Sequence, residues 1–265
     1  MRAAALVALV LVPGCVLFGN DVPCAASADC PAGAHSYCAP ASGTCGAPPA
    51  PLFADDFDDA AAFTGRWSCD AGPGTLVEGG AAHMDLPGNS TPGRHPFHGC
   101  TAAAAAVRDV DAAMTITPTA HETAVAGLLV RVRAEDPDQF AFNESVDVDI
   151  GNSNGVLHVG RSAGPVLGDF LRDPPATPFV GDAPVRLRLR VVGVGPTHVL
   201  AKAWLASGEE PAPWAFDFED GTRALEQAGA VAFAAFRFTD GNVGVAWDAV
   251  RVFAAADVRD DEALP

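Results

Sequence analysis

The stretch that most constrains the fold is residues 229–253, GAVAFAAFRFTDGNVGVAWDAVRVF. It reads as two strands joined at Asp240-Gly241, because the glycine readily takes the positive φ of a tight turn. In the second strand apolar residues occupy both faces, which is typical of a strand inside a packed sheet. The pattern therefore predicts a β-hairpin in an all-β fold, with Asp248 as the one acidic residue on a mostly apolar face.

Short strands and turns also fill most of the remaining chain. Residues 185–191 alternate Val or Leu with arginine, as expected of a half-buried strand with one charged face, and residues 198–205 are its natural partner. Helical alternatives are confined to residues 102–106 and 222–227. Many short strands and little helix predict an antiparallel sandwich of two sheets.

The N-terminus reads as an export signal. Its apolar run, residues 3–12, is too short to span a bilayer as a stable helix. Val-Pro-Gly-Cys at residues 12–15 resembles the bacterial lipobox, which implies a signal peptide at residues 1–14 and a lipid on Cys15 that anchors the protein to a membrane. An ordinary secretory signal peptide is the alternative. Val16 replaces the aspartate that retains some lipoproteins at the inner membrane, so we expect an outer-membrane or cell-surface location.

The cysteine count agrees with export. Seven is odd, and lipidation of Cys15 leaves six for disulfides. Four of the six lie in the polar, loop-rich residues 20–46, which cannot fold by burying apolar surface alone. These four imply two bridges with three alternative connectivities; a zinc site is the other interpretation, although no close CxxC pair is present. The other two imply a bridge in the larger domain. The six are Cys24, Cys30, Cys38, Cys45, Cys69 and Cys100.

The charge balance argues against nucleic acid as a partner. The formal net charge is −17, whereas phosphate backbones bind basic patches. Hydrophobic residues make up 49% of the chain, which is ample for a core. The expected organisation is a signal peptide (1–14), a Cys-rich module with a Pro linker (15–50), a β-sandwich (51–257) and a charged, frayed tail (258–265).

Several segments of the larger domain resemble a known family. FADDF at residues 53–57, followed by GRW at 65–67, resembles the opening of bacterial laminin-G-like domains of the concanavalin A-like lectin/glucanase superfamily. Residues 202–204 with 208–214, and then 245–252, resemble their late and closing strands. The resemblance implies a jelly-roll sandwich of two antiparallel sheets. It leaves the ligand open, because the superfamily includes lectins, glycan-binding modules, glycosidases and protein-binding domains.

Asp147 and Asp149 are the candidates for catalysis, since alternate residues of a strand share one face. Glucanases of the superfamily carry a nucleophile and an acid/base glutamate on one such strand, and retaining hydrolysis needs the two carboxyl groups about 5 Å apart. Gly151 or Asn152 stands where the last glutamate belongs, so the pair is incomplete. The alternative is a solvated strand face paired with arginines. The arginine candidates are Arg131, Arg133, Arg186, Arg188 and Arg190.

Asp56 and Asp248 are candidate ligands of a structural Ca²⁺. The first and last strands of jelly-roll sandwiches commonly neighbour each other, and several superfamily members hold Ca²⁺ there. Carboxylate oxygens are suitable ligands for this hard cation. Asp55 belongs to the same acidic run. The alternative for Asp248 is a hydrogen-bonded structural role.

Three further patterns carry less weight. GRSAG at residues 160–164 matches GxSxG but lacks the following helix, so we interpret it as a hairpin loop. His95 and His98 are spaced for a metal, without identifiable further ligands. Stacking on a sugar needs an exposed aromatic ring, and Trp214 is the best placed of the four tryptophans. Of the others, we expect Trp204 and Trp247 to be buried.

The preferred function is noncatalytic binding of an extracellular or surface ligand, with carbohydrate as the first expectation and a surface protein as the second. One alternative is a glycoside hydrolase that uses Asp147 or Asp149. Another is a purely structural protein of the cell envelope.

Overall fold

The computed structural model describes twelve segments of the chain, which divides into two compact units, Met1–Pro48 and Pro49–Pro265. Cys15, His95 and the Asp240-Gly241 turn lie outside the described residues. No helix in the described segments has the length and apolar character needed to cross a membrane. The segments are residues 22–33, 36–69, 74–86, 98–103, 106–119, 124–133, 144–151, 155–163, 169–172, 179–221, 226–237 and 243–264.

The smaller unit is held together by two disulfides. It contains a 3₁₀ turn, η1 (Ser27–Asp29), and a two-stranded antiparallel sheet of β1 (Tyr37–Ala39) and β2 (Thr44–Gly46). Cys38 and Cys45 lie opposite each other in this sheet, and the bonds are Cys24–Cys38 and Cys30–Cys45. The sulfurs of Cys24, Cys30 and Cys45 lie within 4.8 Å of one another, but bonded sulfurs offer no thiolate to zinc.

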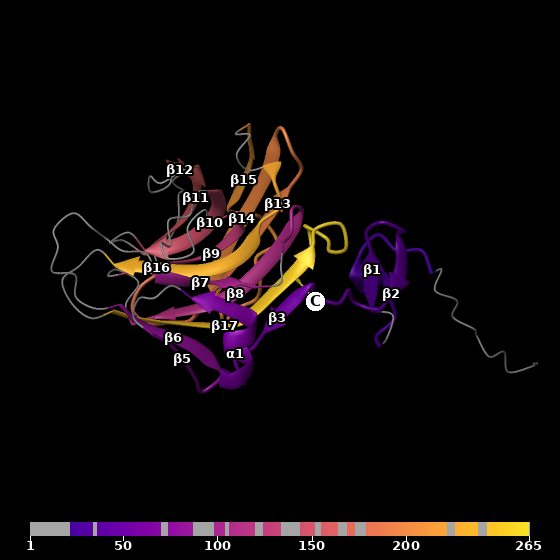
Figure 1. The fold of residues 1–265 in the computed structure, drawn as a ribbon. Helices are drawn as coiled ribbons and strands as arrows, with labels where there is room; N and C mark the ends of the chain where they lie inside the picture. The colour runs from indigo at the N-terminus through magenta and orange to yellow at the C-terminus, as the bar shows by residue number, and fades with distance from the viewer. Residues whose placement is uncertain are drawn as a thin grey trace, which may run out of the picture. The chain divides into compact units, whose positions relative to one another are not determined.

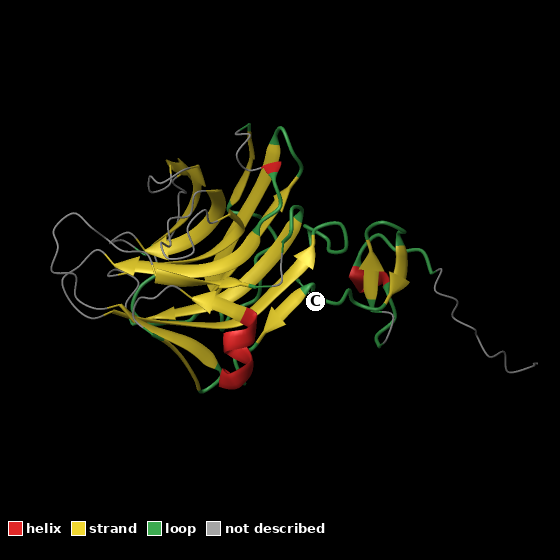
Figure 2. Cartoon of the chain, in the orientation of Figure 1, coloured by secondary structure: helices red, strands yellow, loops and turns green. Residues whose placement is uncertain are grey.

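The larger unit is a sandwich of two antiparallel sheets (Figure 1), as predicted. The seven-stranded sheet has the order β12 (Asp169–Arg172), β11 (Val156–Ala163), β10 (Glu144–Gly151), β9 (Ala124–Arg133), β16 (Ala230–Arg237), β7 (His98–Ala102), β4 (Trp67–Cys69). The eight-stranded sheet has the order β15 (Phe216–Asp220), β14 (Thr197–Leu205), β13 (Val185–Val192), β8 (Val110–Pro118), β17 (Val243–Ala254), β6 (Ala81–Leu86), β5 (Thr75–Glu78), and β3 (Phe53–Asp55) also pairs with β17. Strands dominate the described chain (Figure 2).

The predicted closing hairpin is wrong, although both of its strands exist. β16 pairs with β7 and β9, whereas β17 pairs with β3, β6 and β8 in the other sheet. The two strands face each other across the core, where the rings of Phe233 and Trp247 are 4.6 Å apart. In a sandwich the chain can pass from one sheet to the other, and the inward faces of two consecutive strands then pack against each other.

An aromatic cluster fills the core beside the first strand. The ring of Trp67 lies 5.2 Å from that of Phe53, 5.8 Å from that of Phe57 and 4.7 Å from that of Phe233. The buried carboxylate of Asp55 accepts hydrogen bonds from Trp67 Nε1 and from the backbone N–H of Phe57, both at 2.9 Å. Asp55 is therefore a structural anchor of the opening segment.

The expected neighbourhood of the first and last strands is confirmed. Asp55 of β3 is opposite Val250 of β17. β6 pairs with the first half of β17, up to Trp247, and β3 pairs with the second half. The change of partner coincides with a β-bulge after Asp248, where Ala249 takes a φ of 52°.

One helix, α1 (Ala60–Arg66), was not predicted. Its N-cap is Asp59, whose side chain accepts from the backbone N–H groups of Ala61 and Ala62. Phe63 is its buried residue. The helical alternative at residues 102–106 starts at Ala102, but in the structure Ala102 is the last residue of β7.

The third disulfide, Cys69–Cys100, joins β4 to β7. The two residues lie directly opposite each other in the antiparallel register. The bond therefore ties the edge strand of the seven-stranded sheet to its neighbour.

Candidate functional site

The two candidate carboxylate residues lie on the outer face of the seven-stranded sheet. Val146 and Val148 of β10 are buried in the core, so the alternate positions Asp147 and Asp149 belong to the opposite face. We call this surface the β10 face and define it by these two aspartates together with their register neighbours on β9 and β11. The neighbours are Gly127, Leu129, His158 and Gly160.

Small and apolar residues surround the aspartates on the β10 face. Asp149 lies opposite His158 on β11 and opposite Gly127 on β9. Ala234 of β16 is next in the same row, opposite Gly127. Leu129, Val132, Ala232 and Ala234 form a buried cluster separate from the main core. His158 is only 3% exposed. The described neighbours of the two aspartates on the β10 face are thus small or apolar, apart from His158, and they are shielded from water.

The β10 face can supply hydrogen-bonding groups, but its strand lacks the second catalytic carboxylate. After Asp149 the next residue on the same face of β10 is Gly151, which ends the strand and has no side chain to contribute. Glycoside hydrolysis needs two carboxyl groups on opposite sides of the scissile bond. Carboxylates and an imidazole can still accept or donate hydrogen bonds to hydroxyl groups.

The interpretation of the GxSxG match as a hairpin loop is wrong. Gly160, Arg161 and Ser162 lie within β11, so a regular strand occupies the place of the strained turn that a nucleophile elbow requires. His98 is the first residue of β7.

Arg131, one of the expected partners of the aspartates, is buried and hydrogen-bonds to the backbone of two loops. Its Nε donates to the carbonyl oxygen of Arg108 at 2.7 Å, and its Nη2 donates to that of Gly193 at 3.0 Å. Burial lowers the pKa of Arg131, an effect that Asp109 partly opposes. Arg131 therefore connects a strand of one sheet to loops flanking strands of the other.

The charged face predicted for residues 185–191 is buried in part, not solvated. Arg188 and Asp111 are both 0% exposed. Arg188 Nε and Nη2 donate to the two carboxylate oxygens of Asp111 at 2.9 and 2.7 Å. Glu210 accepts from Arg188 and pairs with Lys202 Nζ at 2.7 Å. Because Leu187 and Leu189 face the core, these ions lie on the outer face of the eight-stranded sheet.

The ion pairs oppose the effect of burial on the two cations Arg188 and Lys202. Burial alone lowers the pKa of Arg188, but hydrogen bonds and charge from Asp111 and Glu210 outweigh it and leave that pKa raised. Lys202 differs, since burial lowers its pKa and Glu210 only partly compensates. We call the group the Arg188 cluster. Its members are Asp111, Arg188, Arg190, Lys202, Glu210 and Trp214.

Trp214 packs against cations in this cluster. Its ring centre lies 4.9 Å from Arg188 Cζ and 4.4 Å from Lys202 Nζ. Its Nε1 donates to the carbonyl oxygen of Asp260 at 2.9 Å. The expected burial of Trp204 and Trp247 is confirmed, and Trp67 is buried too. Trp214 is therefore the partly exposed tryptophan of the described chain, and its ring is in contact with two cations.

The proposed calcium ligands lie near each other beside the bulge of β17. Asp56 is bonded to Arg251 Nη2 at 2.6 Å, and Asp248 accepts from the backbone N–H of Ala249. Burial raises the pKa of Asp248, a shift that the Ala249 N–H opposes and the nearby charge of Asp56 reinforces. In the described segments, no third His, Cys, Asp or Glu ligand atom joins this pair. The pair alone is an incomplete calcium site, and calcium binding stays a prediction.

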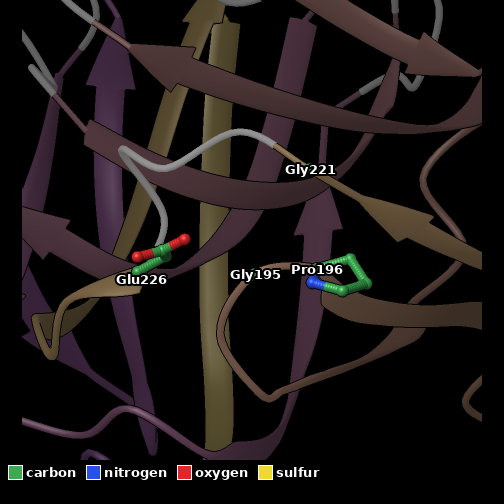
Figure 3. A pocket seen from close by; sticks show the side chains of 4 residues that line it. All are labelled: Gly195, Pro196, Gly221 and Glu226. Atoms are coloured by element: carbon green, nitrogen blue, oxygen red, sulfur yellow. The ribbon is translucent and has the colours of Figure 1, made fainter.

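An open hollow lies at the loops around Gly195 and Pro196. Its volume is about 580 Å³, and Figure 3 shows Glu226 and Pro196 on either side of it. Gly221 completes the lining. A Cβ on Gly195 would lie 3.0 Å from a carboxylate oxygen of Glu226, so a side chain there would crowd the hollow. Among the described residues that line the hollow, Glu226 is the one carboxylate, whereas glycoside hydrolysis needs a pair.

Solved structures with similar folds identify the architecture. An endo-acting O-glycanase of the human gut microbiota that initiates mucin breakdown matches with a TM-score of 0.56 and 10% identity, over 77% of this chain and 99% of that one. A β-1,3-1,4-glucanase from a mouse hindgut metagenome matches with 0.51 and 10%, over 76% and 98%. The β-glucanase of Bacillus licheniformis matches with 0.50 and 8%, over 76% and 97%.

The fold is a concanavalin A-like jelly roll. No protein-family model and no curated protein matches the sequence. At these low identities the likeness shows how the jelly roll is built and assigns no activity to it.

Sequence reasoning missed the Arg188 cluster. Its signal was Asp111, an acidic residue inside an apolar run on the strand next to the arginines. It also missed that His158 lies opposite Asp149, because the register of β10 and β11 is not visible in the sequence.

Arg188→Met is expected to lower the free energy of unfolding by about 3–5 kcal/mol, because it leaves the carboxylate of Asp111 buried without its partner. Arg186→Met is the matched control, since Arg186 lies on the same strand and is exposed. Urea denaturation followed by tryptophan fluorescence measures both. An equal decrease in the free energy of unfolding for the two variants would contradict the role given to the buried pair.

Asp248→Asn is expected to stabilise the calcium-free protein at pH 7. The raised pKa means that ionisation of Asp248 opposes folding above that pKa, and this penalty disappears as the pH falls toward the ordinary value of 3.8. The difference in stability between Asp248→Asn and wild type should therefore become smaller toward acid pH. Thermal unfolding between pH 4 and pH 8 measures it. A variant less stable than wild type throughout would contradict this.

The same variant tests calcium. If Asp56 and Asp248 bind Ca²⁺, added Ca²⁺ raises the melting temperature of wild type and leaves that of Asp248→Asn unchanged. If Ca²⁺ does not stabilise the wild type, Asp248 is only a hydrogen-bonded residue of the bulge.

Proposed function

We propose that this protein is a lipid-anchored protein of the bacterial cell envelope whose jelly roll binds an extracellular glycan without cleaving it. The glycan is bound on the β10 face. A surface protein is the second class of ligand. The disulfide-bonded smaller unit and the Pro linker space the jelly roll from the lipid.

The observation that carries this proposal is the composition of the β10 face. The positions of Asp147 and Asp149 have Gly127, Gly160 and Ala234 beside them in the sheet, and these residues carry no side chain or only a methyl group. Carboxylates accept hydrogen bonds from vicinal hydroxyls, and shielding from water strengthens each such bond. Similar folds in glycan-degrading enzymes support carbohydrate as the ligand class.

Noncatalytic binding is favoured over hydrolysis by the missing second carboxylate. Gly151 stands in the same-face position after Asp149. One aspartate pair on one strand can hold hydroxyl groups, whereas hydrolysis also needs a proton donor for the leaving oxygen.

Glycan binding is tested with the full chain carrying Cys15→Ala, probed against diverse polysaccharides. Saturable binding to a polysaccharide is expected. Asp147→Asn and Asp149→Asn should weaken it about tenfold each, as expected for loss of a hydrogen bond to a charged group. Glu219→Gln is the control, because Glu219 is an exposed carboxylate on β15 of the other sheet.

Release of reducing ends is measured in the same samples. No release is expected. Release that disappears in Asp149→Asn would establish the hydrolase instead. Absence of binding to every glycan would leave a structural envelope role.

The lipid anchor is supported by the lipobox-like residues 12–15 and by the even set of six cysteines left for disulfides. In a bacterial host, wild type should enter the detergent phase of a membrane extract and incorporate a labelled fatty acid. Cys15→Ala should remain in the aqueous phase without label. Labelling that persists in Cys15→Ala would contradict lipidation at this residue.

A further inference from the structure

The C-terminal residues 255–262, which include most of the tail expected to fray (258–265), are docked on the Arg188 cluster. We call them the strap; in Figure 1 they are the yellow segment that follows β17. Val258 is 1% exposed and Ala255 is also buried. The strap therefore contributes apolar contacts as well as the polar ones described next.

Five main-chain carbonyl oxygens of the strap accept hydrogen bonds from the Arg188 cluster. Arg190 donates to two of them, at 2.9 and 3.1 Å, and Arg188 donates to two, at 3.0 and 2.6 Å. Trp214 Nε1 donates to the fifth. The accepting residues, in chain order, are Ala255, Val258, Arg259, Asp260 and Glu262.

Docking of the strap completes the hydrogen bonding of Arg188. A guanidinium carries five N–H donors. Asp111 accepts two of them and Glu210 accepts one. The strap accepts the remaining two, through the carbonyls of Arg259 and Glu262. Without the strap, two donors of a fully buried cation would lose their acceptors, which is strongly unfavourable unless water replaces them.

The contacts also make the docking independent of most strap side chains. Arg259 pairs with Asp261 at 2.8 Å and with Glu262 at 3.1 Å, so charged groups of the strap neutralise one another. Carbonyl oxygens are present in any sequence. Val258 is the exception, because its side chain is buried.

We propose that the strap is a built-in occupant of a peptide-binding platform, recognised through its main chain, and that it closes the outer face of the eight-stranded sheet. The platform is the Arg188 cluster, and it fits an extended peptide that offers carbonyl oxygens and one small apolar anchor. This inference does not depend on glycan binding by the β10 face.

The first test is limited trypsin cleavage after Arg259 in the full chain, measured by mass spectrometry. Cleavage of a docked segment follows the population of its open form. Val258→Asp introduces a buried charge and should speed cleavage at least about tenfold. Trp214→Phe removes a single donor and should speed it by about threefold to tenfold. Ala256→Ser is the matched control within the strap, because Ala256 is exposed, and it should stay near the wild-type rate.

The second test uses a chain that ends at Ala254 and a synthetic peptide of residues 255–265. The peptide should bind the truncated chain saturably and raise its melting temperature. A peptide with Ala at 259 and 261 should bind with similar affinity, and one with Val258→Asp should not bind. If the truncated chain does not fold, the cleavage rates of the full-length variants decide.

Either of two results would overturn the proposal. One is wild-type cleavage as fast as that of the free peptide. The other is equal cleavage of Val258→Asp and Ala256→Ser.

Discussion

The outer face of the eight-stranded sheet depends on one buried guanidinium. Arg188 has no contact with water, so each of its N–H groups needs an acceptor from the protein. Asp111 has to lie on the adjacent strand, Glu210 has to be brought in by the loop after β14, and the strap has to fold back over both. A single residue thus couples two strands, a loop and the C-terminal segment, and closes this face.

The two outer faces consequently differ in chemistry. The outer face of the eight-stranded sheet carries cations and carboxylates that are paired with each other and covered by the strap. The other carries Asp147 and Asp149 among glycine and alanine, and its strand ends at Gly151. The jelly roll itself is shared by proteins of different activities, so the proposal of ligand binding on the β10 face rests on this difference and not on the fold.

Much of the fold could be predicted from the sequence, because alternating patterns mark strands whatever their partners. The pairing of the strands could not be predicted. A turn dipeptide such as Asp240-Gly241 does not indicate whether the two strands beside it belong to one sheet or to two. The three alanines after Asp59 were a helix signal that the prediction overlooked. Alternation of arginine in residues 185–191 suggested that these side chains are exposed to solvent. The burial of Arg188 could not be predicted, because it depends on groups distant in sequence.

The assignment of ligand binding to the β10 face is tested most directly by mapping the footprint of a bound glycan on the full chain with hydrogen–deuterium exchange. The account predicts that the glycan slows exchange in β9, β10, β11 and β16 and leaves β13, β14 and the strap unchanged. A footprint over Trp214 and the strap, with none on β10, would contradict it.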